Sequence, residues 1–387
     1  MLCRICGILP HRERDPLVPL VRLCEHRAIV VARAYDHGMR ILSLLISLAI
    51  ALPLAACGVQ ESLPAEAVPA DTAIVVRADP AKMQSAMIRD AIEAVAGIAR
   101  KSTNPQIVQF SGLAGLQVLS MEEDAEDAKA TDAAMASLVD AGATAIWVVI
   151  PESALSAASD LASDAAEGDA DSLFEYGTAL VQAKTRDAGP AIEKALRAMD
   201  DDLAACTATP LAPGWFAISA TADQKRPAGG DAAMAKSFAS AIDRQSGASM
   251  AMAMRMTDSM RAALSSDDEA MLQAQMMVGR VVSALERLQM LSASVTFGKD
   301  PAIRARMAFG SDGDAAEFNS AWDETLQTIL GFIQMQSMMA AEDGEGGDAP
   351  QPKPVQWGPL FDGLKMRQEG AALSLTLDQE RMRSMMK

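Results

Sequence analysis

The stretch TAIVVRA at residues 72–78, followed at once by Asp79 and Pro80, sets the pattern of this chain. Its β-branched residues predict a strand. Asp followed by Pro predicts the start of a helix, with the aspartate as its cap and the proline in its first turn. Apolar residues from Met83 to Val95 then follow at helical spacing. The ordered part of the chain is therefore expected to begin at Thr72, with a strand that leads into a helix.

The strand-then-helix unit recurs along the chain, and some neighbouring strands form hairpins. Further strands are expected at 143–150, 175–184, 215–222, 249–256, 291–297, 303–309, 363–368 and 371–378. Further helices are expected at 188–202, at 230–243 and from 314 towards 339. Strands separated by helices, with hairpins between them, indicate an α+β fold with a mixed or antiparallel sheet. The recurrence predicts two related halves, 71–200 and 201–387.

An insert interrupts the expected second half. Residues 342–354 read EDGEGGDAPQPKP, which is acidic, rich in Gly and Pro, and apart from its prolines has no apolar side chain larger than that of Ala. Such a composition cannot bury enough apolar surface to offset the entropy of ordering the chain. We expect a disordered loop there.

A basic start, an apolar run and a cysteine stand in order near the beginning of the chain. Met39 and Arg40 precede the apolar run 41–54, which ends in Leu54-Ala55-Ala56-Cys57. This order of features is typical of an export signal. The tetrad resembles the lipobox of bacterial lipoproteins. The resemblance implies a diacylglyceryl thioether on Cys57, cleavage directly before it, and acylation of the new amino terminus.

The same resemblance implies a location. The protein is expected in the bacterial cell envelope, and Gly58, in place of the Asp linked to inner-membrane retention, favours the outer membrane, facing the periplasm. Residues 39–56 would be the signal peptide, and residues 57–70 a tether that holds the body away from the lipid headgroups. Residues 1–38 precede the signal, so we expect them to be translation upstream of the true start.

Which residues are available for catalysis depends on where the mature chain begins. All three histidines, His11, His26 and His37, precede Cys57. With them stand Cys3, Cys6 and Cys24, which could form a zinc site with His26 if this segment were kept. A chain that begins at Cys57 has no imidazole, which excludes Ser-His-Asp catalysis, Cys-His catalysis and His-ligated zinc. Carboxylate pairs and a Ser-Lys pair remain available.

The net charge and the cysteine content limit which partners and which disulfides are expected. The chain carries a net charge of −17, and because residues 1–56 hold seven Arg and four acidic residues, the remainder is more acidic still. An acidic protein repels phosphate backbones, so nucleic acid is not an expected partner. After Cys57 only Cys206 remains. No intrachain disulfide is expected, and Cys206 is expected to be a buried thiol.

Methionines recur at regular spacings. They stand at 335, 338 and 339, at 382, 385 and 386, and alternate at 250, 252, 254 and 256. Thioethers can bind Cu(I). The same spacings are those of a core face of a helix or strand. We expect core packing and no metal, with Met-based Cu(I) binding as the remote alternative.

The sequence thus predicts a lipid-anchored envelope protein with a soluble acidic α+β body and a non-enzymatic binding or structural role. An envelope hydrolase that uses carboxylates or a Ser-Lys pair is the alternative. Cys57 is the predicted site, for lipid attachment, and no catalytic, cofactor or metal site is predicted. The expected partners are the membrane, through the covalent anchor, and an envelope protein of unknown identity.

Overall fold

The computed structural model describes residues 63–101, 125–154, 177–199, 203–219, 230–245, 247–265, 279–342 and 358–385. All of them belong to the unit Ala49–Lys387. The upstream segment 1–38, the signal peptide 39–56, Cys57 and the insert from residue 343 onward lie outside the described residues, and the predictions made for them stay predictions.

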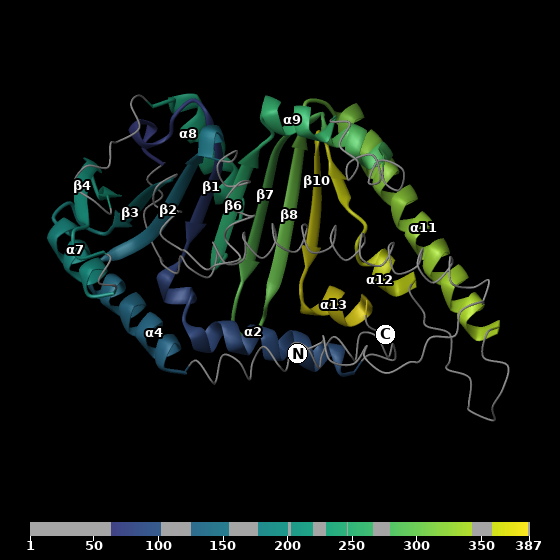
Figure 1. The fold of residues 1–387 in the computed structure, drawn as a ribbon, viewed down its shortest axis with the longest axis horizontal. Helices are drawn as coiled ribbons and strands as arrows, with labels where there is room; N and C mark the ends of the chain where they lie inside the picture. Colours follow the sequence, from purple (N-terminus) through teal and green to yellow (C-terminus); the bar gives the residue numbers. More distant parts are fainter. Residues whose placement is uncertain are drawn as a thin grey trace, which may run out of the picture. The chain divides into compact units, whose positions relative to one another are not determined.

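Within these residues, ten strands form one sheet, drawn as arrows in Figure 1. The strands are β1 (Thr72–Ala78), β2 (Ala143–Pro151), β3 (Thr178–Ala183), β4 (Thr207–Ala212), β5 (Trp215–Ser219), β6 (Met250–Arg255), β7 (Leu288–Thr296), β8 (Ala302–Phe309), β9 (Arg367–Glu369) and β10 (Ala372–Leu377). Their order is β4-β5-β3-β2-β1-β6-β7-β8-β10-β9, and every neighbouring pair is antiparallel. The predicted α+β class is confirmed, with an antiparallel sheet.

Helices follow most of the strands. The α-helices are α2 (Ser85–Ala99), α4 (Ala125–Asp140), α7 (Gly189–Arg197), α8 (Ala232–Asp243), α9 (Asp258–Leu264), α11 (Asp312–Glu342), α12 (Gly358–Asp362) and α13 (Gln379–Met385). Two short 3₁₀-helices are η2 (Ala65–Ala67) and η3 (Pro80–Lys82). Figure 1 shows α2 and α13 along the lower ends of the strands and α9 at their upper ends.

The strand order is mirrored about the central pair β1 and β6. The neighbours are β2, β3, β5 and β4 on one side, and β7, β8, β10 and β9 on the other. In the chain, α7 precedes the β4–β5 hairpin as α11 precedes β9 and β10. This pattern divides the elements between Asp243 and Met250, whereas the sequence pattern placed the boundary at residue 200. A repeated order of elements does not test common descent, so the two related halves stay a prediction.

One face of the sheet packs under α8. Val75, Trp147 and Trp215 point to this face and are buried against Phe238 of α8. The two indole rings lie 5.7 Å apart between centroids, and the guanidinium of Arg77 lies 5.8 Å from the ring centre of Trp147. Alternate residues of strands share a face, so Val75 faces this core, while Ile74 and Val76, which are also buried, face the opposite side of the sheet.

The opposite face packs against other helices. Ile146, Val181 and Phe216 are buried there against residues of α4 and α7, such as Leu138 and Ile192. A third cluster joins α11 to β7, β8 and β10. The sheet is therefore covered on both faces in its first five strands, which explains why β1, β2 and β3 read as nearly continuous apolar runs.

The end of the predicted tether belongs to the body. Leu63, Ala67 and Val68 are buried in the same core as Phe238 of α8. The apolar side chains of this segment therefore pack as core residues. The prediction of a tether at 57–70 is therefore wrong for the segment from Leu63 onward, and residues 57–62 lie outside the described residues.

The contact between this segment and α8 is close. The backbone N–H of Asp231 donates to the carbonyl oxygen of Val68 at 2.8 Å. A Cβ placed on Gly230 would overlap the carbonyl group of Ala65. Only glycine allows two backbones to approach so closely. The start of α8 and the segment 63–68 are thereby fixed to each other.

Candidate functional site

A groove of about 580 Å³ lies between α8 and the strands β6, β7 and β8, next to α9. Its size falls in the range of small-ligand sites. Its lining includes one acidic residue, Asp231, and four arginines: Arg244, Arg255, Arg261 and Arg306. In a chain with a net charge of −17, a hollow with this excess of basic residues is the candidate functional site.

Strand register places two of the arginines on the α8 face of the sheet. Ala253 and Arg255 share one face of β6. Ala253 pairs with Ser292 of β7, and Ser292 pairs with Arg306 of β8. This row crosses three strands and brings Arg255 and Arg306, far apart in sequence, to the same side of the sheet.

Helix α8 forms the opposite wall. Asp231 caps it, since its Oδ1 accepts the backbone N–H groups of Ala233 and Met234 at 2.8 and 3.0 Å. Phe238 on one side of the helix is buried in the core. Ser240 and Arg244, four residues apart, line the groove from the other side.

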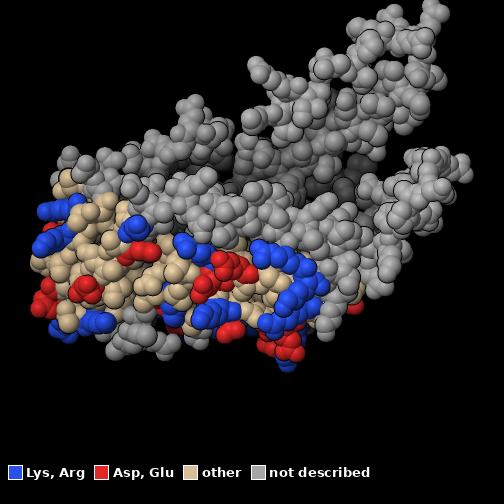
Figure 2. Space-filling view, turned by 90° about the horizontal axis from the view of Figure 1, so that it is seen from below, with Lys and Arg blue, Asp and Glu red and all other residues tan. Residues whose placement is uncertain are grey.

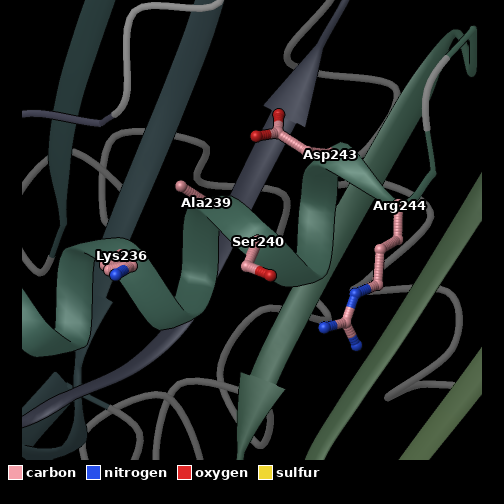
Figure 3. Close-up of a pocket in the computed structure, with 5 residues that line it drawn as sticks. All are labelled: Lys236, Ala239, Ser240, Asp243 and Arg244. Carbon is pink, nitrogen blue, oxygen red and sulfur yellow. The ribbon is translucent and has the colours of Figure 1, made fainter.

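A second, smaller hollow of about 380 Å³ adjoins the helix. It shares Ser240 and Arg244 with the groove and adds Lys236 and Asp243. In Figure 3 the guanidinium of Arg244 extends away from the helix on the side of Ser240, whereas the carboxylate of Asp243 points the other way. Arg244 therefore presents its charge to the hollow without a pairing from its neighbour in sequence.

Gln245 fastens the end of α8 to the sheet. Its Nε2 donates to Ser292 Oγ at 3.3 Å, and Ser294 Oγ donates to its Oε1 at 2.9 Å. All three side chains are buried. A fully satisfied buried network of this kind fixes geometry. The distance between α8 and β7, and so the width of the groove, is set here.

The arginines differ in how far the protein already engages them. Arg261 is fully engaged, because its Nε and Nη2 donate to the carbonyl oxygens of Glu286 and Leu288, and its Nη1 pairs with Asp258. Within the described part of the chain, Arg255 donates a single hydrogen bond, from its Nε to the carbonyl oxygen of Thr72 at 3.2 Å. Arg261 thus shapes the end of the groove, and Arg255 has donors to spare.

Arg306 is the arginine of the groove that has a buried donor without a partner in the part of the chain that the structure describes. Its Nε is buried, and among the described residues it has no hydrogen-bond partner. Its Nη1 lies 3.7 Å from Glu369 Oε2, too far for a hydrogen bond. A buried guanidinium donor without an acceptor costs free energy. Arg306 is the residue of the groove that an incoming acceptor would satisfy.

Two carboxylates near the groove offset part of its charge. Glu152 is half-buried, and hydrogen bonds from Ser259 and Thr257, with a smaller contribution from Arg255, hold its pKa below the ordinary value. Glu369 is half exposed beside Arg306. Figure 2 shows basic and acidic side chains interspersed over another side of the molecule, with basic ones gathered at one end. Basic side chains therefore gather in places on the surface although the net charge of the chain is −17.

Asp79 does not cap a long helix as the sequence predicted. Pro80–Lys82 form η3 and α2 begins only at Ser85. Asp79 is buried, its Oδ2 lies 2.7 Å from Lys82 Nζ, and its Oδ1 has no partner in the described part of the chain. Burial raises the pKa of Asp79 above its ordinary value of 3.8, although Lys82 acts in the opposite direction.

The Asp79→Asn variant tests this pKa shift. A carboxyl group whose pKa is raised by folding stabilises the folded state when protonated, and this contribution is lost as the pH rises through the raised pKa. The free energy of unfolding of the wild type should therefore fall relative to that of Asp79→Asn as the pH rises from about 4 to 7. Urea titrations at several pH values measure the difference. A difference that grows in the opposite direction would contradict the shift.

The structure buries the free thiol. Cys206 has no exposed surface, and burial raises its pKa. Its carbonyl oxygen accepts two hydrogen bonds from Arg197, at 2.7 and 3.0 Å. A neutral, enclosed thiol is a core residue and not a nucleophile.

The methionines of the three groups differ in how far they are buried. Met382 and Met385 are buried, as a core face requires. Met250, Met252 and Met254 share one face of β6 and are half-buried, and Met335 of α11 is exposed. Side chains at 338 and 339 lie outside the description. The buried pair on α13 is not available to a copper ion.

Among the described residues, no helix is long and apolar enough to span a bilayer. In the same part of the chain, no group of three or more His, Cys, Asp or Glu side chains is placed to hold a metal ion.

The groove was not predicted from the sequence. Its arginines come from four different elements between residues 244 and 306, so no local spacing marks them. One signal was present, because Arg304 and Arg306 alternate with Ala305 and Met307 along an expected strand. Basic residues at period two in a strand indicate one polar face on an otherwise apolar sheet.

Comparisons with known proteins add little to this geometry. No protein-family model matches the chain. No curated protein matches it at a significant level. A solved structure described as "Structure of crystal form I of TP0453" is similar to 84% of this chain and 97% of its own, with 8% identity and a TM-score of 0.28.

Proposed function

We propose that this chain is a lipid-anchored binding protein of the bacterial cell envelope, and that its groove binds an anionic ligand. The observation that carries the proposal is Arg306, whose buried Nε has no acceptor in the described protein. Arg255 and Arg244 add further donors on either side, which no described residue engages. An anion in the groove would supply the missing acceptors.

The chemistry of the lining indicates the class of ligand. A guanidinium group is planar and always charged, and its paired N–H donors match the oxygens of a carboxylate or phosphate. Ser237 and Ser240 place hydroxyl groups along the same wall. A basic hollow in an acidic protein also concentrates small anions locally. No catalytic pair of carboxylates is needed for this role.

The envelope location rests on the tetrad that ends in Cys57. The tetrad supports export and acylation, and Gly58 directly after it favours an outer-membrane position facing the periplasm. A protein partner in the envelope belongs to the same proposal. The packed segment that begins at Leu63 fits a short link between the anchor and the body.

Replacement of Arg306 tests the groove. We expect phosphate, pyrophosphate or citrate to raise the melting temperature of the full-length protein in neutral detergent, since a ligand that binds only the folded state stabilises it. Arg306→Gln should weaken that binding at least about tenfold, because a charge-assisted hydrogen bond contributes about 1.5–3 kcal/mol. Thermal unfolding at increasing anion concentration measures the affinity.

Arg280→Gln is the matched control. Arg280 is exposed and pairs with Glu324, outside the groove, so its loss removes the same charge from a different surface. Its anion affinity should equal that of the wild type. Equal losses in both variants would show a nonspecific effect of charge, and no stabilisation by any of the three anions would overturn the proposed function.

Replacement of Cys57 tests the anchor. The protein extracted from membranes should have the mass of a chain that begins at Cys57 and carries acyl groups. Cys57→Ala should lack the acyl mass and leave the membrane fraction, because the thioether requires the thiol. Intact mass spectrometry of both proteins decides the point. An unacylated wild type that begins at Met1 would contradict the lipoprotein assignment and restore the upstream histidines and cysteines to the chain.

A further inference from the structure

We infer that the anion bound in the groove is the phosphate headgroup of an anionic membrane lipid. This inference rests on the proposed function and deepens it, because it names the class of ligand. Three features of the described residues support it: the apolar part of the lining, the place of α8 beside the amino-terminal segment, and the shortness of the link to Cys57.

The lining of the groove is amphipathic. Beside the arginines stand three methionines, Met234 on α8, Met256 after β6 and Met290 on β7. A small inorganic anion has no apolar surface that these side chains could contact. Met is flexible and adapts to irregular apolar groups. Cationic donors next to pliable apolar side chains fit a ligand that is itself part anion and part hydrocarbon, as a phospholipid is where its headgroup meets the glycerol.

Helix α8 joins the groove to the amino-terminal segment. At its start, Asp231 donates its N–H to Val68, and Phe238 packs in the same core as Leu63. The other side of the helix, with Ser240 and Arg244, forms the groove wall. A helix of this length extends about 18 Å. The groove is therefore within one short helix of the point where the chain enters the body.

The link to the predicted anchor is short. Leu63 is already buried, so an acylated Cys57 could lie at most about 20 Å from it, the span of six extended residues. A body held so close to the bilayer keeps the α8 region near the headgroups. A free phosphate in solution would gain nothing from this arrangement, whereas a lipid headgroup is present there at high local concentration.

Soluble probes separate a lipid from a free anion. The full-length protein in neutral detergent would be titrated with inorganic phosphate and with a short-chain phosphatidylglycerol. We expect the lipid to bind at least about tenfold more tightly, because burial of a few methylene groups adds to the phosphate contact. Short-chain phosphatidylcholine at the same concentration controls for the chains alone.

Two variants assign the parts of the ligand. Arg306→Gln should weaken the binding of both phosphate and phosphatidylglycerol. Met234→Gln should weaken the binding of the lipid about tenfold and leave the affinity for phosphate unchanged. The reason is that Gln keeps the length and helix propensity of Met without its apolar surface. Equal affinity for the two probes, or loss of phosphate binding in Met234→Gln, would overturn the lipid assignment while leaving an anion site.

A second experiment measures the same interaction in membranes. The acylated protein would be reconstituted in phosphatidylcholine vesicles with and without phosphatidylglycerol. Amide hydrogen exchange in α8 and β7 should slow when phosphatidylglycerol is present, and this protection should vanish in Arg306→Gln but persist in Arg280→Gln. Protection that is the same in both lipid mixtures would contradict the inference. Absence of binding to every anion, lipid or soluble, would instead count against the proposed function itself.

Discussion

Trp215→Ala should lower the free energy of unfolding by about 3–5 kcal/mol, the usual cost of deleting a fully buried tryptophan side chain. Trp215 is 1% exposed and packs against Trp147 in the core under α8. Its loss leaves a cavity beside Phe238 and removes the contact between the two indoles, which contributes beyond area alone. Urea denaturation followed by circular dichroism measures the change without depending on tryptophan fluorescence.

Trp215→Phe separates packing from hydrogen bonding. The indole Nε1 of Trp215 is buried and has no acceptor among the described residues. Phenylalanine therefore removes an unsatisfied donor and keeps most of the ring, so the loss should be well below that of alanine, about 1.5 kcal/mol or less. A loss in Trp215→Phe as large as in Trp215→Ala would show that the unpaired N–H has a partner after all.

Gly230→Ala should destabilise the protein by about 2–4 kcal/mol, although it adds a single methyl group. That methyl would overlap the carbonyl group of Ala65, so one backbone must move. The movement breaks the bond from Asp231 to Val68 and exposes Leu63 and Val68. Limited proteolysis should cut the amino-terminal segment faster in the variant, and urea denaturation should give the magnitude.

Gly331→Ala provides the matched control. Gly331 lies within α11, and apart from its chain neighbours and the backbone of its own helix no atom lies within 4 Å of the position that its Cβ would take. Alanine has the higher helix propensity, so this variant should be as stable as the wild type or slightly more stable. A loss at Gly331 equal to that at Gly230 would mean that the clash with Ala65 is not the cause.

The strands were predictable where the sheet is buried on both faces. The run at 72–78 matches β1 residue for residue, and 143–150 matches β2 to within one residue. Continuous apolar runs of that length have few other structures open to them. Edge strands follow a different rule. β4 was not predicted, because it contains Pro210 and polar residues. Proline is tolerated there because, among the described strands, β4 has β5 as its single neighbour.

The groove could not be predicted for a related reason. Arg255 ends a strand whose other residues alternate Met and Ala, and Arg306 sits in a strand paired with β7 and β10. Which of their faces is shared depends on strand register, and which face α8 covers depends on the crossover from β5 to β6. Neither is encoded in any window of sequence. The burial of Gln245 on Ser292 and Ser294, which fixes the wall, is likewise a purely tertiary contact.

The mirrored strand order has a consequence for synthesis of the chain. β1 is central in the finished sheet, but its partner β6 begins only at Met250, so the nascent protein first completes a five-stranded unit in which β1 is an edge. In a chain that stops after Asp243, the backbone groups of β1 that pair with β6, from Ile74 to Ala78, lack that partner strand. An apolar edge strand with unpaired backbone groups is a site of self-association. We therefore expect such a truncated chain to aggregate, and the later strands to prevent this by pairing with β1.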